Sequence, residues 1–477
     1  MEAAPPLLPQ ATRDLAAFAA GLRFEAIPAA VIAQVKLSLL DGIGVCLHGA
    51  TLPWTRHVQA MALAEGATPA ATLWGTGQRG SWAQAALVNG TAGHAFEMDD
   101  IHKESILHPN SLTTPIALGY AEQQGGLPGR DLLTAIVAGY EIGTRVGNAA
   151  TMALFLNGFH PQGTSGAFCA AAAAGHLLGL DAARMQHALG IAGSMGAGLM
   201  AAQEGAMVKR LHAGRAAESG VRAALLAERG FTGIPDVLEA PYGGFLSAIA
   251  RTPVAAKLTQ GLGADWETAR TGFKMYPSVT SIHSALDALR HVMATARLTA
   301  ADIERIEVGV GHMTHVHTAW PYRPAGVTAA QMNIFYGLAV TALHGAPTAG
   351  FYEEAYLADP AILGFIPRIA VAEDAALEAM GAPFRHACRI AVHTRDGGVL
   401  RHEVLHRRAS PENPVTPAEV EAKFRANVAG LLSEAEAAEV VAMVANFEVL
   451  ASSRPLTALL AAVRPQDVGG SPANQSA

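Results

Sequence analysis

The chain is short of charged residues and of cysteine. Only 15% of its 477 residues are Asp, Glu, Lys or Arg, against about a quarter in ordinary soluble domains. The formal net charge is −7 and there is no run of basic residues, so the chain lacks the positive surface that binds nucleic acid. Cys46, Cys169 and Cys388 are far apart and form no Cys-x-x-Cys pair. This small number of widely spaced cysteines excludes a disulfide framework and a zinc knuckle, and it predicts a reducing, cytoplasmic location.

Long runs of large apolar side chains are absent as well, although 51% of the residues are hydrophobic. The longest uncharged stretches, such as residues 188–203, consist mainly of small residues and Met, so we expect no membrane span. Small residues suit helices that pack closely in a large interior, and a large interior with little surface charge favours an oligomer. The N-terminal stretch carries Glu2 and no basic region, which is not typical of a signal peptide.

Helical periodicity dominates the first part of the chain. The apolar residues Ile32, Val35, Leu39 and Ile43 follow Pro28 at helical spacing, and proline is well placed in a first helical turn. Further helices are predicted at residues 131–145, 164–178 and 182–203. With a length of 477 residues, two or three domains are expected.

The pattern changes to that of strands from about residue 270. Residues 303–310 alternate as a strand does, and residues 389–405 predict a hairpin with its turn at 396–398. Thr416 and Glu419 form a capping box that opens another helix. We therefore predict a mainly α protein with a large discontinuous all-helical domain and a smaller α+β lid domain. The predicted parts are a helical domain at 1–269, the lid domain at 270–408, helices at 409–465 that rejoin the first domain, and a disordered tail at 466–477.

The few charged residues gather in one segment between His94 and His108. The segment holds three histidines and four carboxylates: His94, His102, His108, Glu97, Asp99, Asp100 and Glu104. Carboxylates and imidazoles this close shift one another's proton affinity, as acid–base chemistry requires. A solvated helix end with its loop would produce the same clustering.

Four other segments place polar groups in apolar surroundings. In the first, His160, Gln162, Gly163 and Thr164 stand at the start of an Ala-rich helix. The free backbone N–H groups of such a helix start suit a carboxylate. An ordinary N-cap with a surface histidine is the alternative.

The other three segments contain cations or a phenol. Lys209 and His212 lie in a basic segment beside glycine, which suits either an anionic substrate or a solvated turn. Lys274 lies at the predicted domain boundary, where pockets are common. Tyr336 stands in the first turn of an apolar helix, where its hydroxyl could donate a proton or its ring could simply pack.

A metal centre is a weaker alternative. His312, His315 and His317 are closely spaced, and on a strand the last two would share a face. No acidic residue accompanies them in the sequence, and the His-Glu-x-x-His pattern is absent. The acidic segment lacks the alternating oxygen ligands of a calcium loop. Dinucleotide-binding, Walker and Gly-x-Ser-x-Gly motifs are absent as well.

Taken together, these segments resemble the MmgE/PrpD family, whose members include 2-methylcitrate dehydratase, cis-aconitate decarboxylase and iminodisuccinate epimerase. The resemblance covers nearly the whole chain. It includes a turn at 41–44, the Asp-Asp…His-Pro stretch, the His160 loop, Lys209-x-Leu-His-x-Gly, Phe273-Lys274 and residues 421–427. It implies an active site between a helical domain and a lid domain, a homodimer, and no metal or organic cofactor.

Carried over residue by residue, the resemblance assigns six positions: Asp100 as the acid of the Asp-Asp pair, His108 and His160 as the histidines, Lys209 and Lys274 as the cations, and Tyr336. The sequence departs from the decarboxylases at two positions. Ile101 stands where they place Thr, and Val279 stands where they have His; the spacing to His108 is also one residue longer. These departures argue against decarboxylation of cis-aconitate. Glu97 replaces an Asp, which is a milder change.

The chemistry that the family shares is removal of a proton next to a carboxylate. From the resemblance together with the segments described above, we expect catalytic roles for Asp100, His108, His160, Lys209 and Tyr336, and substrate contacts for Glu97, His102, Gln162, Gly163, Thr164, His212 and Lys274. We expect a histidine base with a pKa near neutrality, preferably His160, with the ring oriented by Asp100. The expected activity is that of a hydro-lyase on a small hydroxy-polycarboxylate. An iminodisuccinate-type epimerase and a non-catalytic carboxylate-binding protein are the alternatives.

Overall fold

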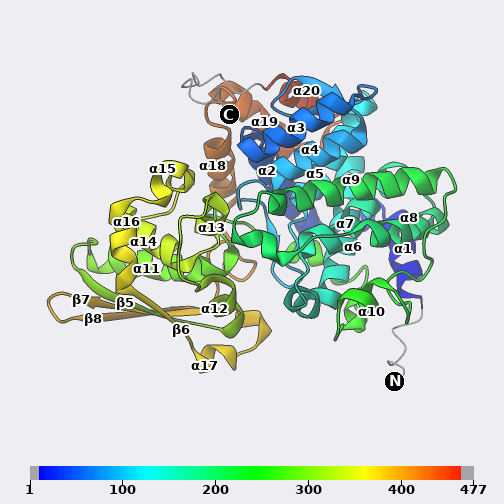
Figure 1. Cartoon of the computed structure of the whole chain (residues 1–477). Helices are drawn as coiled ribbons and strands as arrows, with labels where there is room; N and C mark the ends of the chain where they lie inside the picture. The colour runs from blue at the N-terminus through cyan, green and yellow to red at the C-terminus, as the bar shows by residue number, and fades with distance from the viewer. Residues whose placement is uncertain (1–9, 464–477) are drawn as a thin grey trace, which may run out of the picture.

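The computed structural model describes residues 10–463 and contains two domains side by side, a large helical one and a smaller α+β one (Figure 1). The predicted fold class, mainly α with a small sheet region, is confirmed. The tail predicted at 466–477 lies outside the described residues.

The helical domain is built from long helices in the first half of the chain. They are α1 (Ala11–Gly21), α2 (Ala29–Gly49), α3 (Pro53–Glu65), α4 (Trp82–Gly93), α5 (Asn110–Gln123), α6 (Gly129–Leu156), α7 (Pro161–Leu177), α8 (Ala182–Met195), α9 (Val208–Glu228) and α10 (Phe245–Ile249). Two short antiparallel pairs join them: β1 (Ala71–Leu73) with β2 (Gln78–Gly80), and β3 (Ile101–His102) with β4 (Thr271–Gly272). The domain is therefore not entirely helical.

Small residues let the central helices approach one another closely. A Cβ atom on Gly220 of α9 would lie 2.3 Å from the Cβ of Ala170 on α7. A Cβ on Gly143 of α6 would lie 2.4 Å from the Cβ of Cys169, also on α7. Both distances are far below van der Waals contact, so glycine is required at both crossings. The Ala- and Gly-rich composition is explained by this packing.

The last described helices pack on the first ones. α18 (Pro417–Val428) and α19 (Glu434–Ala445) pack on α2, and α20 (Arg454–Ala462) packs on α5. Phe424 and Phe447 belong to the same hydrophobic core as the N-terminal helices. In Figure 1 these C-terminal helices accordingly lie over the blue helices of the N-terminal part.

The smaller α+β domain, for which we keep the name lid domain, contains a four-stranded sheet. Its strands are β5 (Ile303–Val310), β6 (Ile369–Glu373), β7 (Cys388–Thr394) and β8 (Val399–Val404), in the order β6-β5-β7-β8. β5 pairs parallel with β6 and antiparallel with β7, and β7 and β8 form the predicted hairpin.

Helices cover one face of this sheet (Figure 1). The lid helices are α11 (His283–Ala296), α12 (His312–Thr318), α13 (Val327–Gln331), α14 (Ile334–His344), α15 (Glu354–Leu357), α16 (Pro360–Phe365) and α17 (Ala375–Glu378). α11 packs on β7 and β8, and α14 packs on α11 and α16. The second core of the molecule lies between these helices and the sheet.

Among residues 10–463, one helix, α2, is long and apolar enough to cross a membrane by length and composition. The sequence analysis identified it as a helix but not as a candidate membrane span. Within the structure, 72% of its most apolar window is buried. Its neighbours are α4, α5 and α18. It therefore occupies the position of a core helix of the helical domain.

Two local predictions were wrong, and a third segment differs from the arrangement considered for a metal site. Residues 41–44 lie within α2 rather than in a turn. The helix predicted at 182–203 ends at Met195, and a short 3-10 helix, η2 (Met200–Glu204), follows an extended segment. The histidine-rich stretch forms α12 rather than a strand, because Gly311 ends β5 and starts a new helix.

Candidate active site

The acidic segment becomes a buried loop between α4 and α5. The φ angle of Glu97 is 55°, in the left-handed region that non-glycine residues rarely adopt. After the loop, β3 pairs with β4, with Ile101 opposite Gly272. This pairing joins the helical domain to the start of the lid domain and brings Lys274 beside the loop.

Glu97 is the centre of a buried charge cluster, which we call the Glu97 cluster and which consists of Glu97, Lys209, Arg210 and Lys274. Lys274 donates to Oε2 of Glu97 at 2.8 Å, and Lys209 and Arg210 both donate to Oε1. All four side chains are at most 6% exposed. Burial opposes ionisation of Glu97, but the three cations hold its pKa well below the usual range.

The cluster has more positive than negative charge. The only other carboxylate within ion-pair distance of these cations in residues 10–463 is Asp99, whose Oδ1 lies 3.7 Å from Nζ of Lys274. Three cations therefore face two carboxylates. Burial lowers the pKa of Lys209 to about 8, while Glu97 acts in the opposite direction, so Lys209 is charged at neutral pH. An anionic ligand would complete the charge balance.

His108 is held in one orientation and one tautomer. Its Nδ1 lies 2.6 Å from the backbone carbonyl oxygen of Asp100. Since a carbonyl oxygen only accepts hydrogen bonds, Nδ1 carries the proton and Nε2 of the neutral ring has a free lone pair. Oδ1 of Asp99 lies 3.5 Å from Nδ1, and Oδ2 of Asp99 lies 2.6 Å from Nδ1 of His94. Burial lowers the pKa of His108 to about 3, against the influence of Asp99.

His160 caps the start of α7 by position and pairs with a second histidine. Its Nδ1 lies 2.9 Å from Nδ1 of His212 on α9. Burial and the neighbouring Lys209 hold the pKa of His160 well below its usual range. Burial, with His94 and Lys209, lowers the pKa of His212 to about 4. Both rings are therefore neutral at physiological pH.

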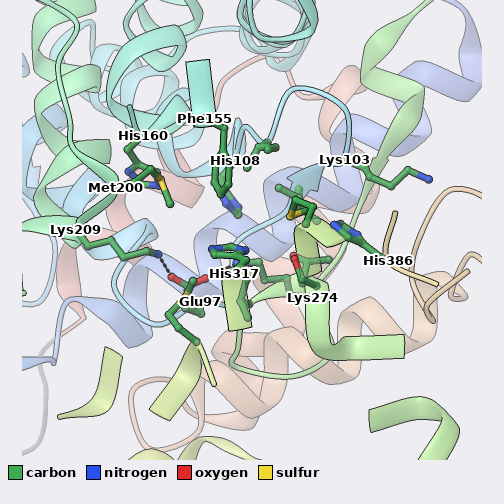
Figure 2. A pocket seen from close by; sticks show the side chains of 17 residues that line it. Glu97, Lys103, His108, Phe155, His160, Met200, Lys209, Lys274, His317 and His386 are labelled. Atoms are coloured by element: carbon green, nitrogen blue, oxygen red, sulfur yellow. Dashed lines mark hydrogen bonds and ion pairs between the residues drawn. The ribbon is translucent and has the colours of Figure 1, made fainter. Parts of the chain in front are cut away.

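These groups meet at a small pocket between the two domains (Figure 2). Its polar lining residues are Glu97, Lys103, His108, His160, Lys209, Lys274, Thr280, Ser281, His317 and His386. Its apolar lining residues are Ile101, Ile106, Phe155, Met200, Val279, Met313 and Met332. Figure 2 shows Lys209 reaching Glu97 from one side, with His108 and His317 nearby, while the ammonium of Lys103 extends away from them.

Five of the residues expected in the site line this pocket: Glu97, His108, His160, Lys209 and Lys274. The expected proximity of His108, His160 and Lys209 is thus found, although the two histidines are about fifty residues apart in sequence. The two positions that depart from the decarboxylase pattern, Ile101 and Val279, also line it. An active-site pocket between the domains is consistent with this arrangement.

The carboxylate of Asp100 does not orient a histidine, contrary to expectation. Its Oδ2 accepts a hydrogen bond from the Tyr140 hydroxyl at 2.6 Å, and its Oδ1 accepts one from the Asn110 backbone at 3.0 Å. Burial raises the pKa of Asp100 well above its usual range. The neighbouring Asp99 is the carboxylate that faces the rings of His94 and His108.

Tyr336 lies outside the pocket, although the sequence analysis expected it in the site. It is fully buried in the lid core, and its hydroxyl donates to the backbone carbonyl of Phe351. Burial and the nearby Tyr322 and Tyr352 raise its pKa. Tyr336 packs beside these two rings rather than lining the pocket, so it is not placed to act as the acid.

His102 does not reach the pocket either. Its Nδ1 contacts the Ser105 hydroxyl at 2.9 Å, and its Nε2 lies 3.0 Å from a carboxylate oxygen of Glu267. Because β3 pairs with β4, the ring is directed to the 3-10 turn that precedes β4.

The start of α7 supports the site without opening onto it. Gln162 accepts a hydrogen bond from the His108 backbone N–H and donates to its carbonyl. The Thr164 hydroxyl donates to the carbonyl of His160 at 2.9 Å. A Cβ on Gly163 would collide with the carbonyl of Ala197, 2.2 Å away. These residues hold the two histidines in place and are not among the residues that line the pocket.

The fold also brings to the site several residues to which the sequence analysis assigned no catalytic or binding role, namely Asp99, His94, Arg210, His317 and His386. His317 was noted only as part of a strand-like metal pattern. On α12 it points to the pocket, and its Nε2 donates to Gln203 at 2.7 Å. The other two histidines of that stretch, His312 and His315, instead approach Glu373 at the surface.

One group in the described residues could hold a metal by composition, and it consists of His94, Asp99 and His108. However, Nδ1 of His94 and Oδ2 of Asp99 are only 2.6 Å apart, which is a hydrogen-bond distance and closer than two ligands around one Zn²⁺ ion would lie. Nδ1 of His108 is already committed to a backbone carbonyl. The observed geometry fits shared protons better than a metal.

Comparisons with known proteins agree with this architecture. Residues 13–256 match the MmgE/PrpD N-terminal domain and residues 276–448 match the MmgE/PrpD C-terminal domain. The chain is 31% identical to the cis-aconitate decarboxylase-like protein oryM of Aspergillus oryzae, over 94% of this chain and 97% of the relative. It is 29% identical to a cis-aconitate decarboxylase of Aspergillus terreus, over 94% and 95%, and 27% identical to the human one, over 97% of each chain. The chain therefore belongs to the MmgE/PrpD family.

Proposed function

We propose that this protein is a lyase that needs no metal or organic cofactor and removes a proton α to a carboxylate of a small hydroxy-polycarboxylate, with loss of the hydroxyl as water. The observation that carries the proposal is the shared pocket of the Glu97 cluster, His108 and His160. It combines an excess of buried positive charge with two neutral imidazoles.

The cations supply the electrostatic part of the reaction. Breaking a C–H bond next to a carboxylate pushes electrons onto that carboxylate, and the transition state is stabilised by fixed positive charge in a closed site. Lys209 and Lys274 line the pocket with ammonium groups that are already held by Glu97. Because they are positioned before the substrate binds, little reorganisation is needed as charge develops.

His108 is the proposed base, in place of the sequence-based preference for His160. Its Nδ1–H is fixed by the Asp100 carbonyl, which leaves Nε2 to accept a proton. Asp99 lies close enough to stabilise the imidazolium that forms, as the aspartate of a catalytic triad does. Since burial lowers the pKa of His108 to about 3, the base is unprotonated throughout the neutral range.

His160 is the proposed proton donor to the leaving hydroxyl. Tyr336 cannot serve, because its hydroxyl is bonded within the lid core. When Nδ1 of His160 accepts a hydrogen bond from His212, the neutral ring carries its proton on Nε2, the atom left for the pocket. A neutral imidazole can donate that proton if it is replaced at the other nitrogen in the same step.

The relatives favour decarboxylation as a second candidate function, since they are named cis-aconitate decarboxylases or a cis-aconitate decarboxylase-like protein. The pocket wall favours dehydration. Ile101 and Val279 line it at the two positions where the motif resemblance places Thr and His in decarboxylases. Without the Thr and His side chains, the pocket has two fewer polar groups to hold a third carboxylate of the substrate. Its hydrocarbon wall suits an apolar part of the substrate instead.

Proton NMR in D₂O with a panel of acids tests the proposal. The panel contains 2-methylcitrate, citrate, cis-aconitate and iminodisuccinate. Olefin signals that grow from a hydroxy acid support the hydro-lyase. Carbon dioxide released from cis-aconitate would replace it with a decarboxylase, exchange without olefin would replace it with an epimerase, and tight binding without either would indicate a binding protein.

Matched lysine variants connect the activity to this pocket. Lys209→Met should abolish turnover of the active acid. Lys257→Met should retain it, since Lys257 forms a half-exposed ion pair with Glu104 outside the pocket. The homodimer and the cytoplasmic location stay predictions.

A further inference from the structure

His160 and His212 form a bridge between two separate cavities. His160 lines the pocket between the domains. His212 lines a second, more open hollow on the helical domain (the outer hollow), bordered by residues 197–199, by Ala201 and Ala202, and by the start of α9. In the described part of the chain this hollow shares no lining residue with the first pocket. The two rings meet through their Nδ1 atoms, 2.9 Å apart.

We propose that His212 is a proton relay that connects the outer hollow to His160, so that the pocket exchanges protons with solvent while substrate closes its mouth. This rests on the proposed function, because it assigns a path for the proton that His160 gives to the leaving group. His212 touches no part of the pocket and acts only through His160.

The backbone around the two rings fixes their contact. The N–H of His160 donates to the carbonyl of Gly198 at 2.9 Å. A Cβ on Gly198 would lie 3.2 Å from Cγ and Nδ1 of the His212 ring and 3.4 Å from Cβ of His160. The segment at Gly198 therefore covers the ring pair closely, and glycine leaves the space that the pair requires.

The surroundings keep the imidazole rings of His160 and His212 neutral. A proton relay between their nitrogen atoms requires neutral rings. Lys209 and His94 stand near the pair and, with burial, disfavour a positive charge on either ring. With one proton shared between the Nδ1 atoms, one ring donates and the other accepts. No carboxylate contacts His160 or His212 among the described residues, so nothing traps an imidazolium between them.

The transfer balances as follows. In the resting state His212 donates its Nδ1–H to Nδ1 of His160, and His160 carries a proton on Nε2. His160 gives the Nε2 proton to the leaving hydroxyl, the shared proton moves to His160, and Nε2 of His212 takes one proton from water or buffer in the outer hollow. The C–O bond breaks, water leaves, and the proton removed from carbon stays on His108 until the pocket opens. On opening, His108 releases its proton, and Nε2 of His160 takes one from the pocket water. The shared proton then returns to His212, which releases the proton on its Nε2, and the resting state is restored. No oxidant, reductant or further reactant is needed.

The pocket is well suited to such a second route. Residues of both domains line it, Lys274, Val279 and His317 from the lid domain and Phe155, His160 and Lys209 from the helical domain. A substrate lying between them would separate His160 from the water at the mouth. When Nε2 of His160 gives up its proton, the ring could then be reprotonated only at Nδ1, through His212.

His212→Asn tests the relay with its geometry preserved. The amide of Asn places a polar atom near the position of the imidazole Nδ1, so it can still hold His160, but it offers no second titrating nitrogen. In dilute buffer we expect kcat to fall at least about tenfold, the lower range for loss of acid–base catalysis, while KM changes less than about twofold. Small buffer acids that enter the outer hollow should restore kcat in proportion to their concentration.

A second readout needs no turnover and uses the protein with its pocket closed by an unreactive dicarboxylate such as succinate, whose carboxylate can take the Nε2 proton of His160 and return it. With ¹⁵N-labelled histidine, the N–H proton of His160 should exchange with solvent more slowly in His212→Asn than in the unmodified protein. His187→Asn is the matched control, since His187 is a half-buried histidine of the same domain that contacts only the backbone of Gly233. It should change neither readout. If His212→Asn does not fold, His212→Gln takes its place.

The results distinguish failure of the relay from failure of the proposed function. Unchanged kcat in dilute buffer, or unchanged exchange at His160, would overturn the relay even in a fully active lyase. If the unmodified protein turns over none of the acids, the proposed function fails, and exchange at His160 still decides the relay. A loss of kcat that buffer does not restore would assign His212 a positioning role only.

Discussion

Replacing Glu97 with Gln tests the charge arrangement on which the site depends. Gln has the same size but no charge, so Lys209, Arg210 and Lys274 would lose the carboxylate that all three contact. Removing one partner of a buried ion pair costs about 3–5 kcal/mol, because the remaining charge stays buried without compensation. We expect the free energy of unfolding of Glu97→Gln at pH 7 to fall by that amount.

The same substitution should move the pH profile. Glu97 raises the pKa of Lys209, which burial holds at about 8. A charge-assisted hydrogen bond is worth about 1.5–3 kcal/mol, which corresponds to about 1–2 pH units. Since the reaction needs Lys209 charged, activity is lost as pH rises through its pKa. The alkaline limb of kcat/KM should therefore move from near pH 8 to about pH 6–7.

Urea unfolding and the pH dependence of kcat/KM measure the two effects. Glu104→Gln is the control from the same segment, because Glu104 is 44% exposed and pairs only with Lys257. It should change stability by less than about 0.5 kcal/mol and leave the limb in place. An alkaline limb at the same pH in Glu97→Gln and in the unmodified protein would refute the assignment of this limb to Lys209.

The other predictions concern single residues and the metal. Lys274→Met should lower kcat/KM at least about tenfold through loss of a charge-assisted contact worth about 1.5–3 kcal/mol, and steady-state kinetics with unchanged kcat/KM would remove Lys274 from the site. Asp99→Asn should lower kcat more than Asp100→Asn, because only Asp99 faces the histidine rings; an equal loss in both variants contradicts this. Tyr336→Phe should leave kcat unchanged and cost about 1 kcal/mol of stability, the typical contribution of one hydrogen bond. Prolonged incubation with a metal chelator should leave activity intact. A loss of activity that added zinc restores would instead identify His94, Asp99 and His108 as a metal site.

The regular elements could be predicted from the sequence because their side-chain periodicity reports burial directly. The strand at 303–310, the hairpin and the capping box at Thr416 were found where the pattern placed them. The cations Lys209 and Lys274 could be identified because a charge amid apolar residues needs a partner. Such arguments depend only on neighbours along the chain.

The side-chain directions within loops could not be predicted in this way. Asp99 and Asp100 are adjacent, yet one faces the histidines and the other faces Tyr140. A loop has no fixed period, so nothing in the sequence distinguishes the two carboxylates. His386 was missed for the same reason, since it lies in an irregular segment before β7.

Contacts with distant parts of the chain explain why Asp100 is buried near the site but does not line the pocket. On α2, Asp41 contacts Lys423 of α18 at 2.6 Å and accepts a hydrogen bond from Asn110 at 3.0 Å. Lys423 also donates to the carbonyl of Met98, and the N–H of Asn110 donates to Asp100. The loop is thus held on both sides of Asp99.

The loop needs these contacts because of its backbone conformation. A left-handed conformation at a residue such as Glu97 costs about 1–2 kcal/mol, and it persists only where surrounding contacts impose it. The contacts of Asp41, Lys423 and Asp100 impose it here, and they aim Glu97 at the cations and Asp99 at His108. The sequence motifs at 41–44 and 421–427 therefore maintain the shape of the buried loop between α4 and α5, although neither motif lines the pocket.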